Sequence, residues 1–484
     1  MRIPAVLRKN ATWLIGLAAT LAVIVIPLVL LQPRTTQARD NPAASVPTRV
    51  PATDHSHLLQ GPFASGSEVT AACLQCHESA ASDFMKTTHW TWESAPVMAD
   101  WRGETVTIGK KNQINNFCIS AQGNENKCMS CHAGYGWEDD DFDFANPLNV
   151  DCLVCHADRS LYAKGDYGYP LAELDLVAAA QSVGLPTREN CGFCHYDGGG
   201  GNNVKHGDMD SSLNYPSESL DVHMGRLDLQ CIDCHQGPDH AIKGRLLADN
   251  LTIPAEEQVQ STDCHAEAPH ADQRINQHTS SVACQTCHIS AIALRNPTKM
   301  TWDWSTSGQD RPEDHLTYLK IKGDFRYETE VTPTYRWFNG SNAYRYILGD
   351  TIDPSRHAMI NLPDGDITDP NARIYPFKVH VANQPYDTVN NILLAPRTAG
   401  EDGYWTTFDW PSGLALGAED AGIPFSGQYD FAETWMYWPI AHMVQPAEDA
   451  LQCEGCHGPD GRMDWKALGY NGDPIEWGSR PLKK

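Results

Sequence analysis

The sequence predicts a mainly α-helical fold with much irregular structure, in which a β-containing insert precedes the last of a series of short segments. A five-residue pattern, Cys-x-x-Cys-His, occurs seven times in 484 residues. Counting a degenerate copy at Ser261, successive copies begin 23 to 55 residues apart, which leaves room for a short helix and a loop each. The spacing then widens to 169 residues between Cys284 and Cys453, and this gap defines the insert.

The complete motifs share two thiols at positions i and i+3 and an imidazole at i+4. They comprise Cys73, Cys76 and His77; Cys128, Cys131 and His132; Cys152, Cys155 and His156; Cys191, Cys194 and His195; Cys231, Cys234 and His235; Cys284, Cys287 and His288; and Cys453, Cys456 and His457. On a helix this spacing places all three groups on one face, where two thioethers can hold a porphyrin edge and the histidine can reach its iron. Disulfide frameworks lack this pattern, and structural zinc would not need a histidine after every pair.

The pattern therefore predicts haem c, with the motif histidines as proximal iron ligands. The degenerate copy, Ser261-Thr-Asp-Cys264-His265, keeps one thiol and the imidazole. We expect it to hold an eighth haem through a single thioether at Cys264, with loss of that haem as the alternative. Because such short segments cannot build an apolar core alone, the porphyrins are expected to supply much of it.

The first residues predict export. Residues 1–38 contain four basic and no acidic residues, with an apolar run from about Ala11 to Leu31. This run is typical of a signal peptide, and it is also long enough to act as a membrane anchor. Residues 39–72 form an N-terminal extension. We expect a periplasmic protein that is soluble after cleavage or anchored to the inner membrane, in an oxidising compartment where haem is attached.

The charge balance excludes several partners. The net charge is −25, and becomes −29 without the four basic residues of the leader. Such a chain does not bind nucleic acid or an anionic membrane through its net field. An anionic substrate would need a local basic site, for which Arg102, Lys110 and Lys111 are candidates.

The remaining chain divides into three parts. Residues 73–290 form the haem-dense core, and residues 291–430 form a Tyr- and Trp-rich insert with short strands and turns, such as Tyr335-Arg-Trp-Phe before Asn339-Gly340. Residues 431–484 are predicted to hold a helix and the last haem. The helix would begin near Phe431 and place Trp435, Trp438 and His442 on one face, with the tryptophans packing in the core.

The sixth iron ligands are harder to predict, because a neutral imidazole from anywhere in the chain can serve. Histidines outside the motifs are the first candidates, whereas His315 and His357 lie in polar surroundings and are expected to be ordinary. The candidates are His55, His89, His223, His240, His270, His278, His380 and His442.

Cys118 is the one cysteine outside every motif, ten residues before Cys128. A free cysteine is commonly a buried structural thiol. Near an electropositive iron it could instead be a thiolate nucleophile. Both interpretations remain open at this point.

Several short segments carry a resemblance to a known family. They are Asp54-His55-Ser56, Thr88-His89-Trp90, Asn115-Asn-Phe-Cys118, Val204-Lys205-His206-Gly-Asp208, His278-Thr-Ser-Ser-Val-Ala-Cys284 and His442-Met-Val-Gln-Pro-Ala. With these segments and the uneven motif spacing, nearly the whole mature chain resembles the octahaem tetrathionate reductase family of periplasmic cytochromes. The resemblance implies bis-histidine ligation at every haem but one.

The exception implied by the resemblance is the haem of the second motif, where a lysine amine binds the iron. By position this lysine is Lys205, and the family's active-site cysteine and asparagine correspond to Cys118 and Asn115. A carboxylate expected three residues before the lysine is replaced by Asn202, so protons would come from Lys205, His206 or water. Burial beside a cationic iron favours the neutral amine that ligation requires.

These features lead to a functional expectation with an alternative. The first is a periplasmic reductase of tetrathionate, and plausibly of nitrite and hydroxylamine, supplied with electrons by an upstream redox protein or a quinol-linked cytochrome. The alternative is a multihaem electron conduit without its own substrate. A nitrite reductase of another lineage is a third reading, although no motif here ends in the lysine of the pentahaem enzymes.

Overall fold

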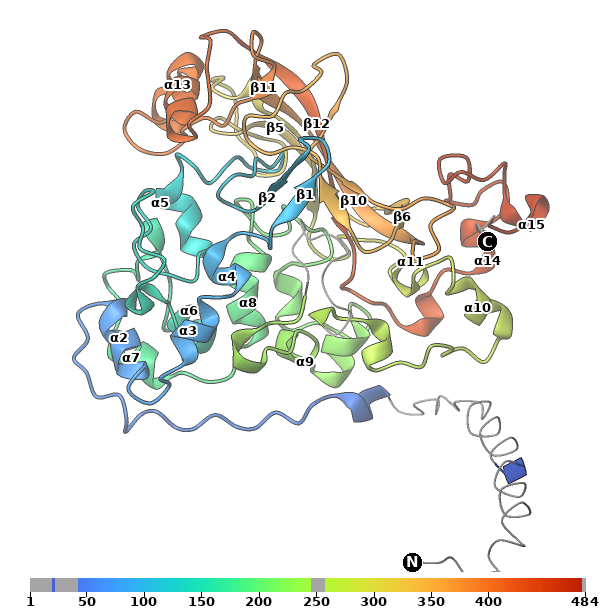
Figure 1. Cartoon of the computed structure of the whole chain (residues 1–484), viewed down its shortest axis with the longest axis horizontal. Helices are drawn as coiled ribbons and strands as arrows, with labels where there is room; N and C mark the ends of the chain where they lie inside the picture. The colour runs from blue at the N-terminus through green and yellow to red at the C-terminus, as the bar shows by residue number, and fades with distance from the viewer. Residues whose placement is uncertain (1–19, 22–41, 245–256, 481–484) are drawn as a thin grey trace, which may run out of the picture. The chain divides into compact units, whose positions relative to one another are not determined.

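A computed structural model describes residues 20–21, 42–244 and 257–480 (Figure 1). It divides into two compact units, one made of residues 1–45 and 261–276 and the other of residues 46–260 and 277–484. The predicted leader lies almost wholly outside the described residues. Within them, no helix has both the length and the apolar character needed to span a bilayer.

The helices are short, as the spacing predicts, and half of those in the described residues carry motifs. The motif helices are α2 (Gly66–Cys73), α5 (Glu125–Cys128), α6 (Leu153–His156), α8 (Arg188–His195), α9 (Cys231–Cys234), α11 (Cys284–His288) and α14 (Cys453–Cys456). The others are α3 (Ala80–Phe84), α4 (Thr88–Thr91), α7 (Leu176–Gln181), α10 (Gln273–His278), α12 (Tyr404–Thr407), α13 (Trp410–Asp420) and α15 (Pro474–Trp477). Thr187 and Asn190 form a capping box that starts α8.

The insert forms an eight-stranded sheet, larger than the short strands predicted from its sequence. Its strands are β3 (Thr298–Asp303), β4 (Tyr318–Leu319), β5 (Gly323–Glu328), β6 (Thr334–Phe338), β8 (Ala358–Met359), β10 (Arg373–Asp387), β11 (Ile392–Leu393) and β12 (Tyr429–Pro439). The order is β4-β5-β3-β10-β12-β8, and β6 and β11 also pair with β10. Two small sheets join β1 (Val97–Ala99) to β2 (Glu104–Val106) and β7 (Asn342–Tyr344) to β9 (Asn361–Pro363).

The prediction of a helix from Phe431 was wrong, because this segment is the strand β12. It pairs antiparallel with β10, with Trp438 opposite Lys378 and Met436 opposite His380. Ala432, Thr434, Met436 and Trp438 are buried, whereas Glu433 is exposed. Burial at every second residue is typical of a strand. The helix was predicted from the spacing of the aromatic residues, and that spacing did not reveal the alternation.

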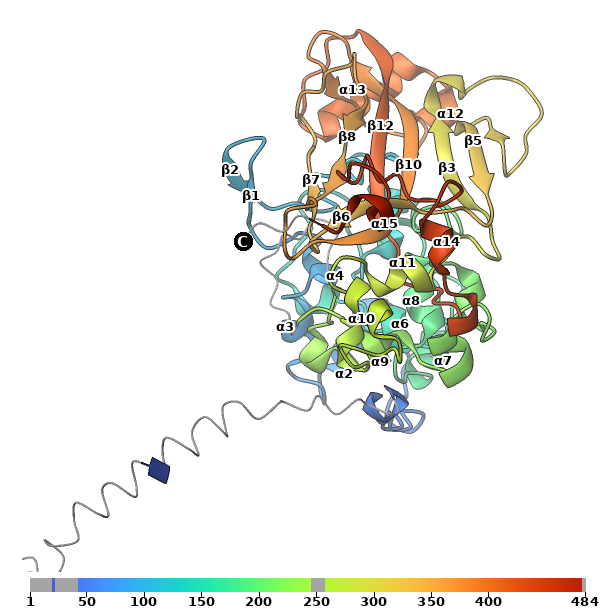
Figure 2. The same ribbon diagram turned by 90° about the vertical axis from the view of Figure 1, so that its right-hand side faces the viewer.

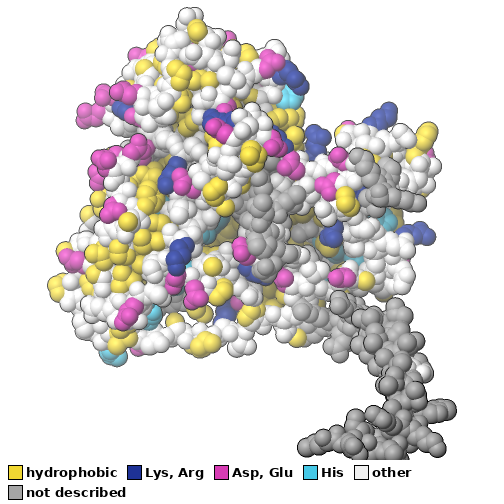
Figure 3. All heavy atoms as spheres, viewed as in Figure 1, with side chains coloured by type: hydrophobic (Ala, Val, Ile, Leu, Met, Phe, Trp, Pro, Cys, Tyr) yellow, Lys and Arg dark blue, Asp and Glu magenta, His cyan; other side chains and the backbone are white. Residues whose placement is uncertain are grey.

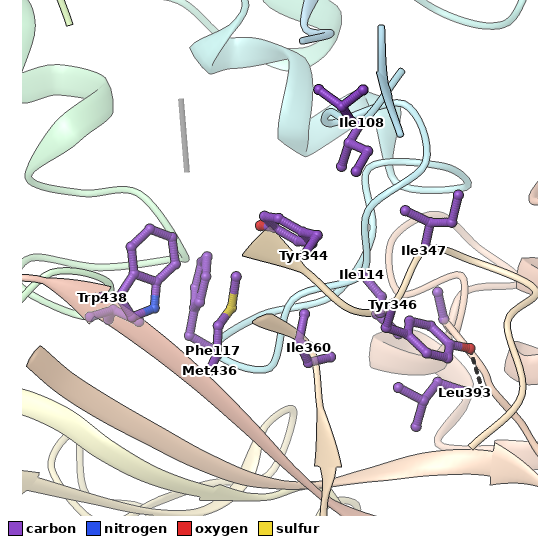
Figure 4. Packing of buried hydrophobic residues seen from close by; sticks show 13 residues of the cluster. Ile108, Ile114, Phe117, Tyr344, Tyr346, Ile347, Ile360, Leu393, Met436 and Trp438 are labelled. Carbon is purple, nitrogen blue, oxygen red and sulfur yellow. Dashed lines mark hydrogen bonds between the residues drawn. The ribbon is translucent and has the colours of Figure 1, made fainter. Parts of the chain in front are cut away.

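The buried face of β10 and β12 packs against loops of the haem-dense core. Figures 1 and 2 show these strands lying over the segment that follows β2. Phe117, Val204, Met436 and Trp438 belong to one buried apolar cluster, and Figure 4 shows Phe117, Met436 and Trp438 grouped beside β12. The sheet therefore forms one wall of the region around Cys118 and Lys205.

Candidate functional site

Histidine rings from distant segments face each other at a nearly constant separation. Their ring centroids are 6.3 or 6.4 Å apart in the pairs His55 and His77, His89 and His195, His156 and His240, His235 and His442, and His278 and His457. Two imidazoles on one iron, with Fe–N bonds of about 2 Å and about 1.1 Å from each nitrogen to its ring centre, give about 6.3 Å. Each pair joins one motif histidine to one candidate sixth ligand, so the residues present fit a haem.

The second ring nitrogen of several of these histidines has a hydrogen-bond acceptor. Nδ1 lies 2.8 Å from the carbonyl of Gly184 in His156, 2.8 Å from that of Lys243 in His235, and 2.6 Å from Asp473 Oδ1 in His457. Iron-ligating histidines commonly donate their other N–H in this way, which directs Nε2 at the metal. Burial lowers the pKa of His195 to about 3 and also lowers the pKa values of His89, His156 and His235. These rings are therefore neutral and able to ligate.

The remaining candidate ligands are His223, His270 and His380. His223 is in the π-helical turn Val222–Arg226, and His270 Nδ1 lies 3.2 Å from Asn276 Oδ1 within the smaller unit. His380 is fully buried in β10, where no motif histidine ring of the described residues lies against it, and its ligation of an iron stays a prediction. Neither of its ring nitrogens is hydrogen-bonded.

His132, in the second motif, differs from the paired histidines because an aromatic cage encloses it. The surrounding rings belong to Trp90, Trp92, Trp137, Phe142 and Phe144. Its Nε2 lies 2.8 Å from the carbonyl of Trp90, and Nδ1 is the nitrogen without a partner. The structure thus places no histidine ring across from His132.

Lys205 is half-buried and lies within electrostatic range of the sulfurs of Cys131 and Cys194. Burial, reinforced by the positive charge of Lys110, lowers the pKa of Lys205 to about 7. At neutral pH a large fraction of this amine is therefore unprotonated, which is the form that binds iron. The Nζ atom is 4.9 Å from the centre of the Trp438 ring.

His206, the next residue, also contacts Trp438, with ring centroids 5.1 Å apart. Burial, with the nearby Lys205 charge, lowers its pKa well below the ordinary value, and its Nε2 has no hydrogen-bond partner. The ring is therefore neutral, and a role of His206 in supplying protons stays a prediction.

Cys118 lies in a turn that Asn115 closes. The backbone N–H of Cys118 donates to Asn115 Oδ1 at 2.7 Å, and Asn115 Nδ2 donates to the carbonyl of Ile119. Both ends of the amide are engaged, so Asn115 orients Cys118, and its role as an active-site residue stays a prediction. Asn202 likewise accepts from the backbone of Ser211 at 2.9 Å and closes a turn.

Trp438 connects the Cys118 loop to the Lys205 loop. The Phe117 ring lies 5.3 Å from the Trp438 ring, on which Lys205 also packs. Gly199 makes this approach possible, because it has φ of +87° and a Cβ there would lie 2.4 Å from the Phe117 ring. The run of four glycines at 198–201 was a sequence signal for this contact, and it was missed.

Two buried lysines of the sheet were also missed. Lys299 in β3 donates to the carbonyl of Phe117 at 2.8 Å and lies within electrostatic range of Cys118. Lys378 in β10 donates to the carbonyls of Val204 and Lys205. Burial lowers the pKa values of Lys299 and Lys378 well below the usual lysine value, so both act here as hydrogen-bond donors rather than as a fixed positive charge. Figure 3 shows acidic side chains spread over the visible surface.

Thiols of different motifs also lie side by side. The Cys194 sulfur is 3.6 Å from the carbonyl of Cys131, and the two thiols are in contact. Cys73 contacts Cys152, and Cys191 contacts Cys231, in the same way. The points at which the motifs would attach porphyrins are therefore close together.

The comparisons with known proteins agree with these features. Residues 299–460 match a family model described as bacterial cytochrome c. The crystal structure of octaheme cytochrome c from Shewanella oneidensis is 47% identical, with a TM-score of 0.83, and covers 90% of this chain and 100% of that chain. An uncharacterized protein of Archaeoglobus fulgidus is 26% identical over 238 residues, which cover 39% of this chain and 79% of that protein.

Proposed function

This chain belongs to the octahaem c-type cytochromes, and we propose that it reduces a small inorganic anion at the haem of its second motif. Tetrathionate is the first candidate substrate, and nitrite and hydroxylamine are the others. The observation that carries the proposal is that Lys205 and Phe117, the neighbour of Cys118, both pack on the Trp438 ring. Lys205 also lies within electrostatic range of Cys131, and Cys118 within that of Cys128, so both residues adjoin the second motif. Periplasmic location and an upstream redox protein or quinol-linked cytochrome as electron donor are parts of the same proposal.

In this proposal, eight haems are bound by the motif cysteines, with Cys264 alone holding the haem of the degenerate motif. The haem groups supply one-electron transfer and an iron that accepts a further ligand. His55, His89, His240, His278 and His442 would be sixth ligands of the haems whose histidines they face. Lys205 would be the sixth ligand at His132, and its amine is easier to displace than a packed imidazole.

The chemistry assigned to Cys118 follows thiol–disulfide exchange. Its thiolate attacks the central sulfur–sulfur bond of tetrathionate, which breaks and releases one thiosulfate while the other half stays bound to the cysteine. Two electrons then break that second bond, release the second thiosulfate and restore the thiolate.

The thiol contacts support a route for these electrons. Cys194 lies against Cys131, so the fourth motif adjoins the second, and Cys191 in turn contacts Cys231 of the fifth motif. We assign the fourth motif as the immediate electron donor to the second. A route of this kind also suits the alternative function, an electron conduit, which the histidine pairs at 6.3 Å favour.

The decisive experiment compares three substrates in one variant. We expect Cys118→Ala to abolish tetrathionate reduction, because cleavage through a cysteine intermediate needs that sulfur. Nitrite and hydroxylamine can bind the iron after Lys205 leaves, so their reduction should depend less on the thiol. The readout is the ratio of turnover rates of anaerobically purified protein, with Ser120→Ala as a control variant in the same loop.

Equal loss of all three activities in Cys118→Ala, with haem content unchanged, would show that the thiol is structural. If the wild type reduces none of the three substrates and its ferric irons bind no added ligand, the conduit is the better description.

A further inference from the structure

The loop that carries Lys205 is held by the sheet of the insert. Lys378 Nζ donates to the carbonyl of Val204 at 2.7 Å, to that of Lys205 at 3.2 Å and to Thr298 Oγ1 at 2.6 Å. Thr298 in turn donates to the carbonyl of Asn203 at 2.6 Å. Three successive carbonyls of the loop are therefore bound to side chains of β3 and β10.

These contacts determine where the Lys205 side chain is directed. The carbonyls of Val204 and Lys205 belong to the two peptide planes on either side of the Lys205 α-carbon. Since each plane is rigid, fixing both carbonyls fixes φ and ψ at Lys205 and hence the direction of its Cα–Cβ bond. The loop is also tied at its far end, where the backbone N–H of Gly207 donates to Asn203 Oδ1 at 3.0 Å.

A lysine suits this task for a chemical reason. The Lys378 amine is a hydrogen-bond donor at the end of a long side chain, and its Nζ has three oxygen partners within hydrogen-bond distance. Its side chain is 1% exposed, so no water replaces a lost partner. Losing the amine would leave two buried carbonyls without donors, and the loop would move to satisfy them.

We propose that Lys378 is a positioning residue that holds Lys205 in the geometry needed to bind the iron of the second motif's haem. The inference rests on the proposed function only through the assignment of Lys205 as that ligand. It also gives the insert a role at the site, since the insert supplies a support that the haem-dense segments lack.

The neighbouring lysine provides a matched control. Lys299 is 2% exposed, lies on the same sheet and also donates to a backbone carbonyl, that of Phe117 at 2.8 Å. Replacing either lysine with methionine removes a buried amine, and the hydrogen bonds that it donates, from the same sheet. The two variants differ in the loop they release, so a general loss of stability affects both and loss of Lys205 ligation affects one.

The experiment uses the ferric holoprotein with cyanide as an added ligand. Lys205 ligation is followed by electron paramagnetic resonance and near-infrared spectra, and cyanide affinity is measured by titration. We expect Lys378→Met to weaken the lysine-ligated signal and to bind cyanide about tenfold more tightly, because the competing amine is held less well. Lys299→Met should retain the wild-type spectrum and affinity.

Unchanged spectrum and cyanide affinity in Lys378→Met, or equal changes in both variants, would overturn the inference. If Lys378→Met does not accumulate, Thr298→Val removes the hydroxyl that joins Lys378 to Asn203, and it should produce a smaller change in the same direction. No change in Thr298→Val would then overturn the inference. A wild-type spectrum without a lysine-ligated haem refutes the ligand assignment itself, independently of Lys378.

Discussion

The pKa of Lys205 makes its binding to iron dependent on pH and on one neighbouring charge. Burial and the charge of Lys110 lower this pKa from 10.5 to about 7. The difference of about 3.5 units corresponds to a penalty of about 5 kcal/mol on the ammonium form. Below this folded-state pKa, the unprotonated fraction of Lys205 falls about tenfold for each pH unit. Binding of the amine to iron then becomes weaker by about 1.36 kcal/mol per unit.

The sign of the pH effect follows from this depression. The folded-state pKa of Lys205 lies below the unfolded value. The free-energy cost of burying the ammonium is therefore fully present below about pH 7 and is lost as the pH rises towards 10.5. Ligation should therefore weaken as the pH falls, and since iron competes with the proton, the midpoint should lie at or below pH 7. Spectra of the ferric protein between pH 5 and 8 would measure it.

The sharper perturbation is Lys110→Gln, which removes the exposed charge that helps to lower this pKa. The pKa of Lys205 should rise, and the midpoint should move up by roughly half a unit, the size of one screened charge. Lys86→Gln has the same change of charge at an exposed ion pair with Asp83 and should leave the midpoint unchanged. A midpoint that is the same in all three proteins would refute the reasoning.

Two further predictions concern stability and cofactor content. Asp151→Asn should destabilise the protein by about 3–5 kcal/mol and lower its melting temperature, because the buried charge of Lys164, 3.0 Å away, loses its partner; a melting temperature like that of the wild type would contradict this. Intact mass should show eight covalently bound haems, with one fewer in Cys264→Ala, and seven in the wild type would rule out the single thioether.

The haem-binding pattern could be predicted from the sequence because it is local. Each motif places its cysteines and histidine within five residues, so one turn of helix is sufficient to bring them together, and the structure has short helices at these places. The histidines whose rings face motif histidines were also identified as candidate ligands by residue type. Which motif each serves depends on long-range packing, as with His89, whose ring faces His195 more than one hundred residues away.

The insert shows why other features could not be predicted. The spacing of Trp435, Trp438 and His442 fits a helix, but pairing with β10 makes the segment a strand, because eleven residues of β12 are in register with it. Local periodicity could not reveal a partner about fifty residues away. The position of Trp438 between Phe117 and Lys205 follows from that pairing.

The sequence by itself determined that this is a multihaem cytochrome with a single cysteine outside its motifs, since the residues that attach each haem are contiguous in the chain. Only the tertiary structure showed that Asn115 closes the Cys118 turn and that the sheet holds the Lys205 loop through Lys378. Those contacts join residues far apart in the chain, and their energy depends on burial that exists only after the insert has packed on the haem-dense core.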